Sequence, residues 1–122
     1  MSLTKTGLNY IINVLGGVKA PVSASNIVLC VGDGAAGFNA SQNALVGTNT
    51  YQKALDIGFP IVETPKITFK TTFNTDEANF AWNEWGIYNK DENVLLNRVV
   101  QSNGTKLMNQ TWVLEVTLEF TT

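Results

Sequence analysis

Residues 112–120 read Trp112-Val-Leu-Glu-Val-Thr-Leu-Glu-Phe120 and form the most regular stretch of the chain. Large apolar residues occupy every second position, and smaller or charged residues lie between them. Successive side chains of a β-strand point to opposite faces, so the pattern predicts a strand with one buried and one solvated face. Because a strand needs neighbours for its backbone hydrogen bonds, this segment indicates a β-sheet.

Three more strands are predicted in the segments that precede it. Residues 67–73 alternate Ile and Phe with Thr and Lys, which is typical of a half-buried strand. A second strand is expected over 80–88, and the polar turn 89–93 connects it to a third over 94–101. Asn103-Gly104 is a hairpin-type turn into the last strand. Four consecutive antiparallel strands predict a β-meander.

One short helix is predicted at the start of the chain. Four apolar residues recur there at helical spacing: Leu8, Ile11, Ile12 and Leu15. Thr4 or Thr6 can cap the helix, and Gly16-Gly17 ends it. The first interpretation is that this apolar stripe packs against the sheet of the same chain. A stripe that faces a partner is the alternative.

The N-terminal half also contains two candidate strands around a soft segment. The apolar run 27–31 predicts a buried strand, and residues 51–57 predict another. We therefore expect one domain over residues 1–122, mainly β in an α+β arrangement. The expected architecture is an antiparallel β-sandwich or curved sheet, with a C-terminal four-strand meander and one short N-terminal helix.

The charge balance excludes several kinds of partner. Eight basic and ten acidic residues give a net charge of −2, and the basic residues are scattered from Lys5 to Lys106. Binding to nucleic acid or to an anionic membrane needs a basic face, so neither is expected. The first residues lack the apolar core of a signal peptide, and no membrane span is predicted. We expect synthesis in a cytoplasm.

The residue types for common enzyme chemistry are missing or poorly placed. The chain has no histidine, which removes the usual general base and imidazole metal ligands. Cys30 stands alone in an apolar run and is interpreted as a buried, unreactive thiol. Two adjacent carboxylate pairs, 76–77 and 91–92, lie in predicted turns where side chains diverge. We expect no enzyme activity, no catalytic residue, no cofactor and no metal.

The glycine-rich stretch after the first strand is interpreted as a turn followed by a docking loop. Residues 31–37 superficially resemble a phosphate-binding loop, but no Lys-Ser/Thr and no periodic helix follow. Small and polar residues continue to about Thr50, and connections of this length are often functional. The candidate docking residues are Gly32, Asp33, Gly34, Gly37 and Phe38; a plain mobile loop is the alternative.

A buried ion pair is predicted within the C-terminal hairpin. Glu84 lies between two tryptophans, where burial requires a partner, and Arg98 is the only arginine of the chain. The two residues fall on adjoining predicted strands, so we expect an interstrand pair with a structural role. The neighbouring aromatic residues have two interpretations, core packing or stacking on a sugar: Trp82, Trp85, Tyr88 and Trp112.

The order of several short motifs resembles that of phage tail-collar and tail-fibre head domains. The motifs are a Leu-Thr-x-x-Gly opening, a Val-Gly-Asp-Gly strand end, Ala44-Leu45-Val46, Trp85-Gly-Ile-Tyr-Asn89 and Leu95-Leu96-Asn-Arg-Val99. The resemblance implies a virion structural protein that forms homotrimers and attaches to a tail, neck, baseplate or capsid. It implies no catalytic residues.

The sequence departs from this family at its end, because the chain stops at Thr122 directly after the last predicted strand. Fibre proteins usually continue into a shaft and a receptor-binding tip. We therefore expect an anchoring, collar or capsid-decoration unit located in the virion and made in the host cytoplasm. The alternative from another class is a carbohydrate-binding module that recognises host polysaccharide.

Overall fold

The structure is a computed structural model that describes residues 2–121. It contains one helix and eight strands within this range: α1 (Lys5–Leu15), β1 (Ile27–Gly32), β2 (Thr50–Ala54), β3 (Ile61–Glu63), β4 (Lys66–Phe73), β5 (Glu84–Asn89), β6 (Val94–Leu95), β7 (Val99–Val100) and β8 (Trp112–Glu119). All strand pairs are antiparallel. The expectation of a mainly β fold with one short N-terminal helix is confirmed.

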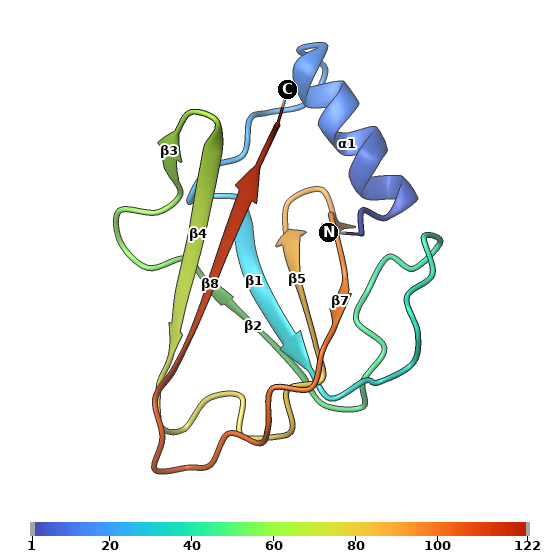
Figure 1. Cartoon of the computed structure of the whole chain (residues 1–122). Helices are drawn as coiled ribbons and strands as arrows, with labels where there is room; N and C mark the ends of the chain where they lie inside the picture. Colours follow the sequence, from blue (N-terminus) through green and yellow to red (C-terminus); the bar gives the residue numbers. More distant parts are fainter. Residues whose placement is uncertain (1, 122) are drawn as a thin grey trace.

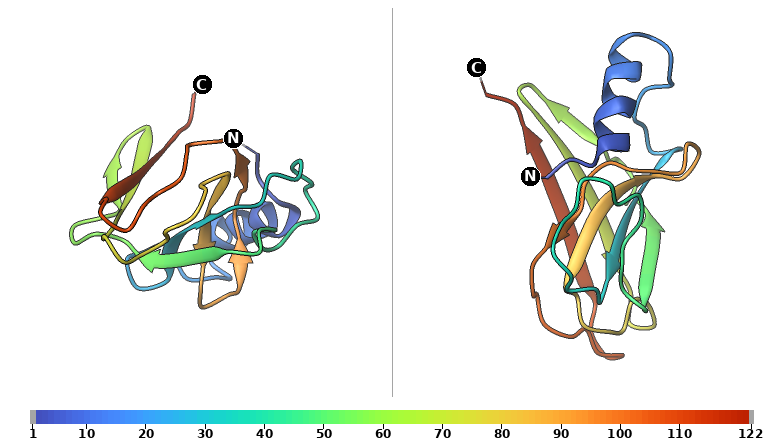
Figure 2. Two further views of the ribbon diagram at one scale, coloured as in Figure 1. Left: turned by 90° about the horizontal axis from the view of Figure 1, so that it is seen from below. Right: turned by 90° about the vertical axis from the view of Figure 1, so that its right-hand side faces the viewer.

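The strands form two sheets in a sandwich-like arrangement (Figure 1). One sheet has the order β2-β1-β5-β6, with β7 also paired to β5, and the other has the order β3-β4-β8. All six residues of β1 are buried, as its apolar sequence predicts. The core between the sheets includes Leu29, Phe69, Ile87 and Val116. Figure 2 shows the long β4–β8 ribbon facing the larger sheet in two further views.

The predicted C-terminal meander is wrong in two of its three pairings; the second predicted strand does pair with the third, as β5 with β6 and β7. β8 pairs with β4 along its whole length, from Phe73↔Trp112 to Lys66↔Glu119, whereas β5 pairs with β1 in the other sheet. Residues 74–83 cross from one sheet to the other, and residues 101–111 cross back. Alternation within a strand reports which face is buried and carries no information about its neighbour, so adjacency in sequence was a poor guide to pairing.

The boundaries of two predicted strands also change. The 80–88 segment becomes a strand only from Glu84, and the 94–101 segment is interrupted between β6 and β7. At the interruption, the Asn97 side chain accepts a hydrogen bond from the Ile87 N–H at 2.8 Å in place of a backbone carbonyl. Asn103-Gly104 lies in the returning loop, where the Trp82 N–H donates to the Gly104 carbonyl at 2.8 Å.

The helix forms where predicted but presents the other face to the sheet. Thr4 caps it by accepting a hydrogen bond from the Gly7 N–H at 2.9 Å. Gly7 and Tyr10 are buried; a Cβ on Gly7 would collide with the backbone of Leu96. The predicted inward stripe instead faces out: Leu8 is 48%, Ile12 56% and Leu15 84% exposed. Close contact through a glycine, not the larger residues, sets the orientation of the helix.

Candidate functional site

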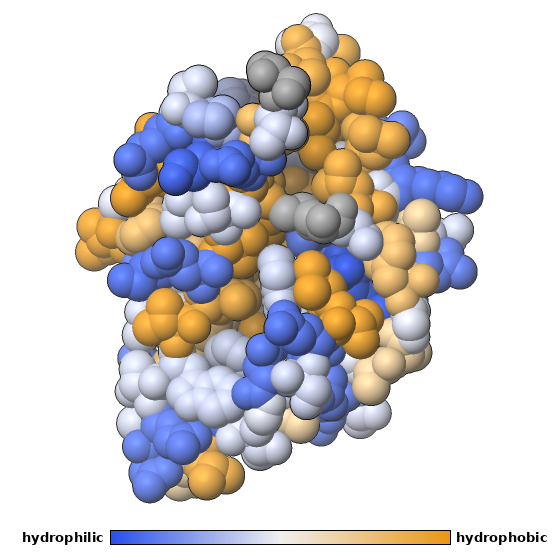
Figure 3. Space-filling model, in the orientation of Figure 1, coloured by the Kyte–Doolittle hydropathy of each residue, from blue (hydrophilic) through white to orange (hydrophobic). Residues whose placement is uncertain are grey.

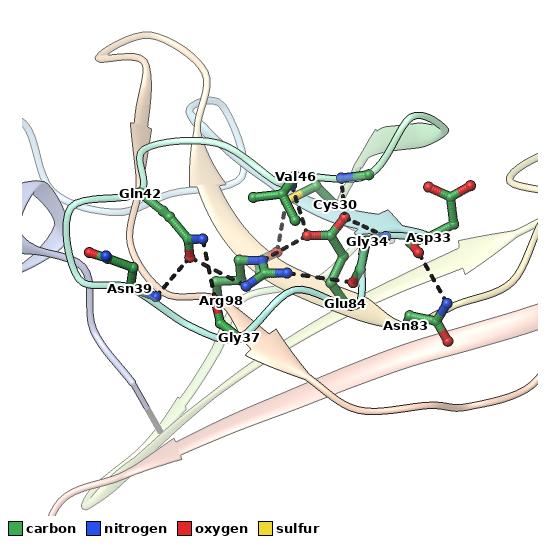
Figure 4. A network of polar contacts seen from close by, with 12 residues as sticks. Cys30, Asp33, Gly34, Gly37, Asn39, Gln42, Val46, Asn83, Glu84 and Arg98 are labelled. Atoms are coloured by element: carbon green, nitrogen blue, oxygen red, sulfur yellow. Dashed lines mark hydrogen bonds and ion pairs between the residues drawn. The ribbon is translucent and has the colours of Figure 1, made fainter.

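The most concentrated polar site lies where the long segment between β1 and β2 meets the start of β5. The register places Gly32, the last residue of β1, opposite Glu84, the first residue of β5. Arg98 lies between β6 and β7, on the other side of β5. The two charged side chains therefore meet beneath the segment 33–49, which folds over them (Figure 4).

The predicted pair of Glu84 and Arg98 is present and fully buried. Arg98 Nε donates to Glu84 Oε1 at 2.7 Å, and both side chains have 0% exposure. The carboxylate also accepts three backbone N–H groups, from Gly34 at 2.9 Å, Val46 at 2.9 Å and Gly47 at 2.7 Å. Buried charges are tolerated when they are paired and hydrogen-bonded, and this carboxylate meets both conditions.

The guanidinium group connects the pair to the outer part of the segment. Arg98 Nη1 donates to Gln42 Oε1 at 3.3 Å, and Nη2 donates to the Gly34 carbonyl at 3.5 Å. Gln42 Oε1 also accepts the Asn39 N–H at 3.0 Å. A single ion pair thus holds residues at the beginning, middle and end of the segment (Figure 4).

Glycines are required where the segment closes over the carboxylate. A Cβ at Gly34 would lie 2.5 Å from Glu84 Oε2 and 2.6 Å from the Gly47 nitrogen. A Cβ at Gly32 would also collide with the Glu84 carboxylate, and one at Gly47 with Asp33. The glycines in the Val-Gly-Asp-Gly stretch therefore leave room for the carboxylate of Glu84. In a phosphate-binding loop, the corresponding space would hold a phosphate group.

Asp33 closes the base of the segment. Its carboxylate accepts the Asn49 N–H at 3.0 Å and the Asn49 side-chain amide at 2.8 Å. Hydrogen bonds from Asn49 lower the pKa of Asp33 below its usual value, because they favour the charged form. The Asp33 carbonyl in turn accepts the Asn83 side-chain amide at 3.0 Å. Asp33 therefore fixes the two ends of the segment side by side.

The predicted docking residues divide into two groups. Gly32, Asp33 and Gly34 take part in the buried network around Glu84 or in the base of the segment. A Cβ at Gly37 would meet no atom within 4 Å, and Phe38 is 36% exposed. Only the outer part of the segment is available to a partner, and a docking role for it stays a prediction.

The Glu84 carboxylate and the Cys30 thiol are both closed to solvent. Glu84 has 0% exposure and four hydrogen-bond donors on its two oxygens, so no substrate reaches it from solvent. Burial raises the pKa of Cys30 to about 12, and its thiol donates to the Gly86 carbonyl at 3.3 Å. Within residues 2–121, no three acidic or thiol side chains are grouped so that they could hold a metal ion.

The two adjacent carboxylate pairs do not converge on a common point. Glu77 accepts hydrogen bonds from Lys53 Nζ at 2.6 Å and from the Tyr51 hydroxyl at 3.1 Å. Glu92 forms an ion pair with Lys19 at 2.9 Å. The sequence interpretation of both pairs as solvated turns missed these contacts within the chain. The contacts join segments that are too distant in sequence for a local pattern to reveal them.

A groove lined by tryptophans lies at the end of the sandwich. Trp82, Trp85 and Trp112 contribute to it together with the amides of Gln101 and Asn103. Trp82 is 4% exposed, and its ring meets that of Trp112 edge to face, with centroids 5.0 Å apart. This arrangement is typical of core packing, because a sugar-stacking platform presents the flat face of a ring to solvent.

Sequence reasoning found both members of the central ion pair but missed the residues that surround it. Gln42, Val46 and Gly47 contact the pair from 37 to 56 positions away in the sequence. Two of these contacts use backbone N–H groups, which every non-proline residue carries, so no residue type marks them. The glycines were the only sequence signal for these contacts. They indicated that another group lies close to the backbone, but they did not identify that group as the Glu84 carboxylate.

The described part of the chain has no helix with the length and apolar character that crossing a membrane requires. Comparison with known proteins provides no further assignment: no protein-family description, no curated protein and no solved structure matches the chain.

Proposed function

We propose that the chain is a structural protein of a bacteriophage particle, which self-associates and docks onto a tail, neck, baseplate or capsid. The resemblance to tail-collar and tail-fibre head domains suggests three copies per assembly. In this role the chain would act as an anchoring, collar or decoration unit without enzyme activity. It would be made in the host cytoplasm and incorporated into the virion.

One observation carries the proposal: the motifs behind the resemblance converge in space on a single structural element. Gly34 ends the Val-Gly-Asp-Gly stretch, Val46 ends the Ala-Leu-Val segment, and both donate to the carboxylate of Glu84. Glu84 precedes the Trp-Gly-Ile-Tyr-Asn motif, and Arg98 belongs to the Leu-Leu-Asn-Arg-Val motif. Three separate motifs thus contact one buried carboxylate, which lies directly before a fourth motif, and a shared framework of this kind supports a structural role.

Mass spectrometry of purified particles tests the proposal. The phage that encodes the chain would be purified on a density gradient, and its peptides would be counted against those of the major capsid protein. We expect a fixed stoichiometric ratio across the gradient peak, while abundant host cytoplasmic proteins fall away. Absence of the chain from infectious particles would contradict the proposal.

Recognition of host polysaccharide is the second candidate, and the tryptophan groove is the observation in its favour. Its amides could hydrogen-bond sugar hydroxyls beside the rings of Trp85 and Trp112. Titration of the protein with host capsular or cell-wall polysaccharide, followed by tryptophan fluorescence, separates the two functions. A saturable change that Trp112→Phe abolishes would favour the sugar-binding module; no change is expected of the virion protein.

A further inference from the structure

Helix α1 is apolar on both of its sides. Its inner face places Tyr10 and Val14 against the core, and Gly7 against the backbone of Leu96. Its outer face carries Leu8, Ile12 and Leu15, which are 48%, 56% and 84% exposed. A surface helix normally has polar residues opposite its buried stripe, whereas a helix that is apolar all round is normally buried.

Lys5 is the only charged residue of α1. Between Lys5 and Lys19 no residue is charged, and the polar residues of the helix beyond its first turn are asparagine and tyrosine. Exposed helix faces usually carry Lys, Glu or Arg, which keep them solvated and prevent association. Figure 3 shows the apolar side chains gathered over α1 as one of the largest patches on that side of the molecule.

The outer face continues into a groove beside the end of β8. Leu3, Ile11, Leu118 and Phe120 line this groove together with Thr117 and Glu119, and Phe120 is 69% exposed. Figure 1 places α1 and the C-terminal end of β8 at the same end of the sandwich. The helix face and the groove together expose on the order of 500 Å² of apolar surface, at the upper end of the range for the largest patch of a monomer.

We propose that the outer face of α1 is the self-association surface, and that a second copy of this chain covers it. This inference rests on the self-association in the proposed function and names the surface responsible. A standard interface buries about 800 Å² per partner, and roughly 65% of that area is apolar between identical subunits. The apolar area beside α1 matches that requirement.

The chemistry of the face favours an identical partner over a different protein. Interfaces between different proteins are about as polar as the rest of the surface and use charges to select the partner. Within α1 the outer face offers such a partner a single charge, Lys5 at the start of the helix. Its side chains at positions 8, 12 and 15 are four and three residues apart. This spacing is typical of the apolar stripe through which two helices pack against each other.

Two matched double variants test the surface. Ile12→Glu with Leu15→Glu places two charges on the outer face of α1. Ile57→Glu with Met108→Glu places two charges on other exposed apolar positions, at 103% and 75% exposure, which do not line the groove beside β8. Light scattering coupled to size-exclusion chromatography, over a range of protein concentrations, gives the mass of each. Thermal unfolding followed by circular dichroism checks that each variant is folded.

We expect the wild type and the Ile57/Met108 variant to form the same oligomer, and the Ile12/Leu15 variant to dissociate at least about 100-fold more readily. An oligomer that survives the helix charges overturns the surface inference while self-association stands. A wild type that is monomeric at every concentration overturns the self-association in the proposed function as well.

A second measurement keeps the inference testable if the helix charges disturb folding. Leu15→Cys and Ile57→Cys each introduce one exposed thiol, since the native Cys30 is buried. Under mild oxidation with copper phenanthroline, we expect Leu15→Cys to form a disulfide-linked dimer quickly and Ile57→Cys to do so slowly. Equal rates for the two variants would overturn the inference.

Discussion

The Glu84–Arg98 pair and the outer face of α1 reverse the usual distribution of polar and apolar groups. Two opposite charges lie at 0% exposure in the interior, while Leu15 is 84% exposed on the surface. The charges find every partner they need within the chain, because backbone N–H groups and Gln42 surround them. The side chain of Leu15 is left largely uncovered by the described residues. The first region is complete in one molecule, and we propose that a second copy of the chain covers the second region.

This difference implies different experimental behaviour for the two regions. Changes at the ion pair should act on folding of the single chain, because they leave a buried charge or hydrogen-bond donor without a partner. Changes on the outer face of α1 should act on association and leave folding nearly unchanged. Substitutions at the ion pair therefore test the effect on folding, and substitutions on the outer face of α1 test the effect on association.

The largest effect is expected for Arg98→Met, which removes one partner of the buried pair. The Glu84 carboxylate would keep its three backbone donors but lose its counter-charge. We expect a loss of about 3–5 kcal/mol in the free energy of unfolding, measured by urea denaturation. Unchanged stability of the variant would contradict a structural role for the pair.

A smaller loss is expected for Gly34→Ala, which forces a methyl group against the Glu84 carboxylate and the Gly47 backbone. Relieving that overlap should cost about 1–3 kcal/mol of unfolding free energy. Gly37→Ala is the matched control, since nothing lies within 4 Å of its Cβ position. The melting temperatures of the two variants are compared with that of the wild type. Equal melting temperatures for Gly34→Ala and Gly37→Ala would contradict the described packing of the segment.

The two faces of α1 provide the third comparison. Tyr10→Phe removes a hydroxyl that accepts the Asn89 side-chain amide at 2.9 Å and donates to the Ala20 carbonyl at 3.1 Å. We expect a loss of about 1 kcal/mol in chemical denaturation. Leu15→Ser, on the outer face, should change the stability of the monomer by less than about 0.5 kcal/mol. A larger effect for Leu15→Ser at low protein concentration would mean that the outer face packs within its own chain.

The smallest effect concerns acid and Asp33, which lies at the exposed edge of the segment. Its pKa is lowered in the folded chain by hydrogen bonds from Asn49. A lowered pKa contributes stability above the unfolded value of about 4, and that contribution is lost as the pH falls through the folded value. Between about pH 6 and pH 2, Asp33→Asn should therefore show a slightly shallower fall in melting temperature than the wild type. Identical slopes would mean that Asp33 contributes nothing to the acid sensitivity of the fold.

The sequence was a good guide to the longest local elements, although it did not predict the short strand β3. Alternation in residues 67–73 and 112–120 identified β4 and β8 together with their buried faces, since side-chain direction has a period of two in any strand. Capping by Thr4 and the end at Gly16 bounded the helix. The pairing of Glu84 with Arg98 was also accessible, because a carboxylate between tryptophans needs a partner and the chain has a single arginine.

Tertiary structure alone decided how those elements meet. The pairing of β8 with β4 depends on the crossing segments 74–83 and 101–111, whose paths no periodicity encodes. The outward direction of Leu8, Ile12 and Leu15 depends on Gly7 reaching the backbone of Leu96, a contact between residues 89 positions apart. Local sequence determines which residues favour a buried position. Only the folded chain determines which of them are buried, because all elements pack against the same limited core.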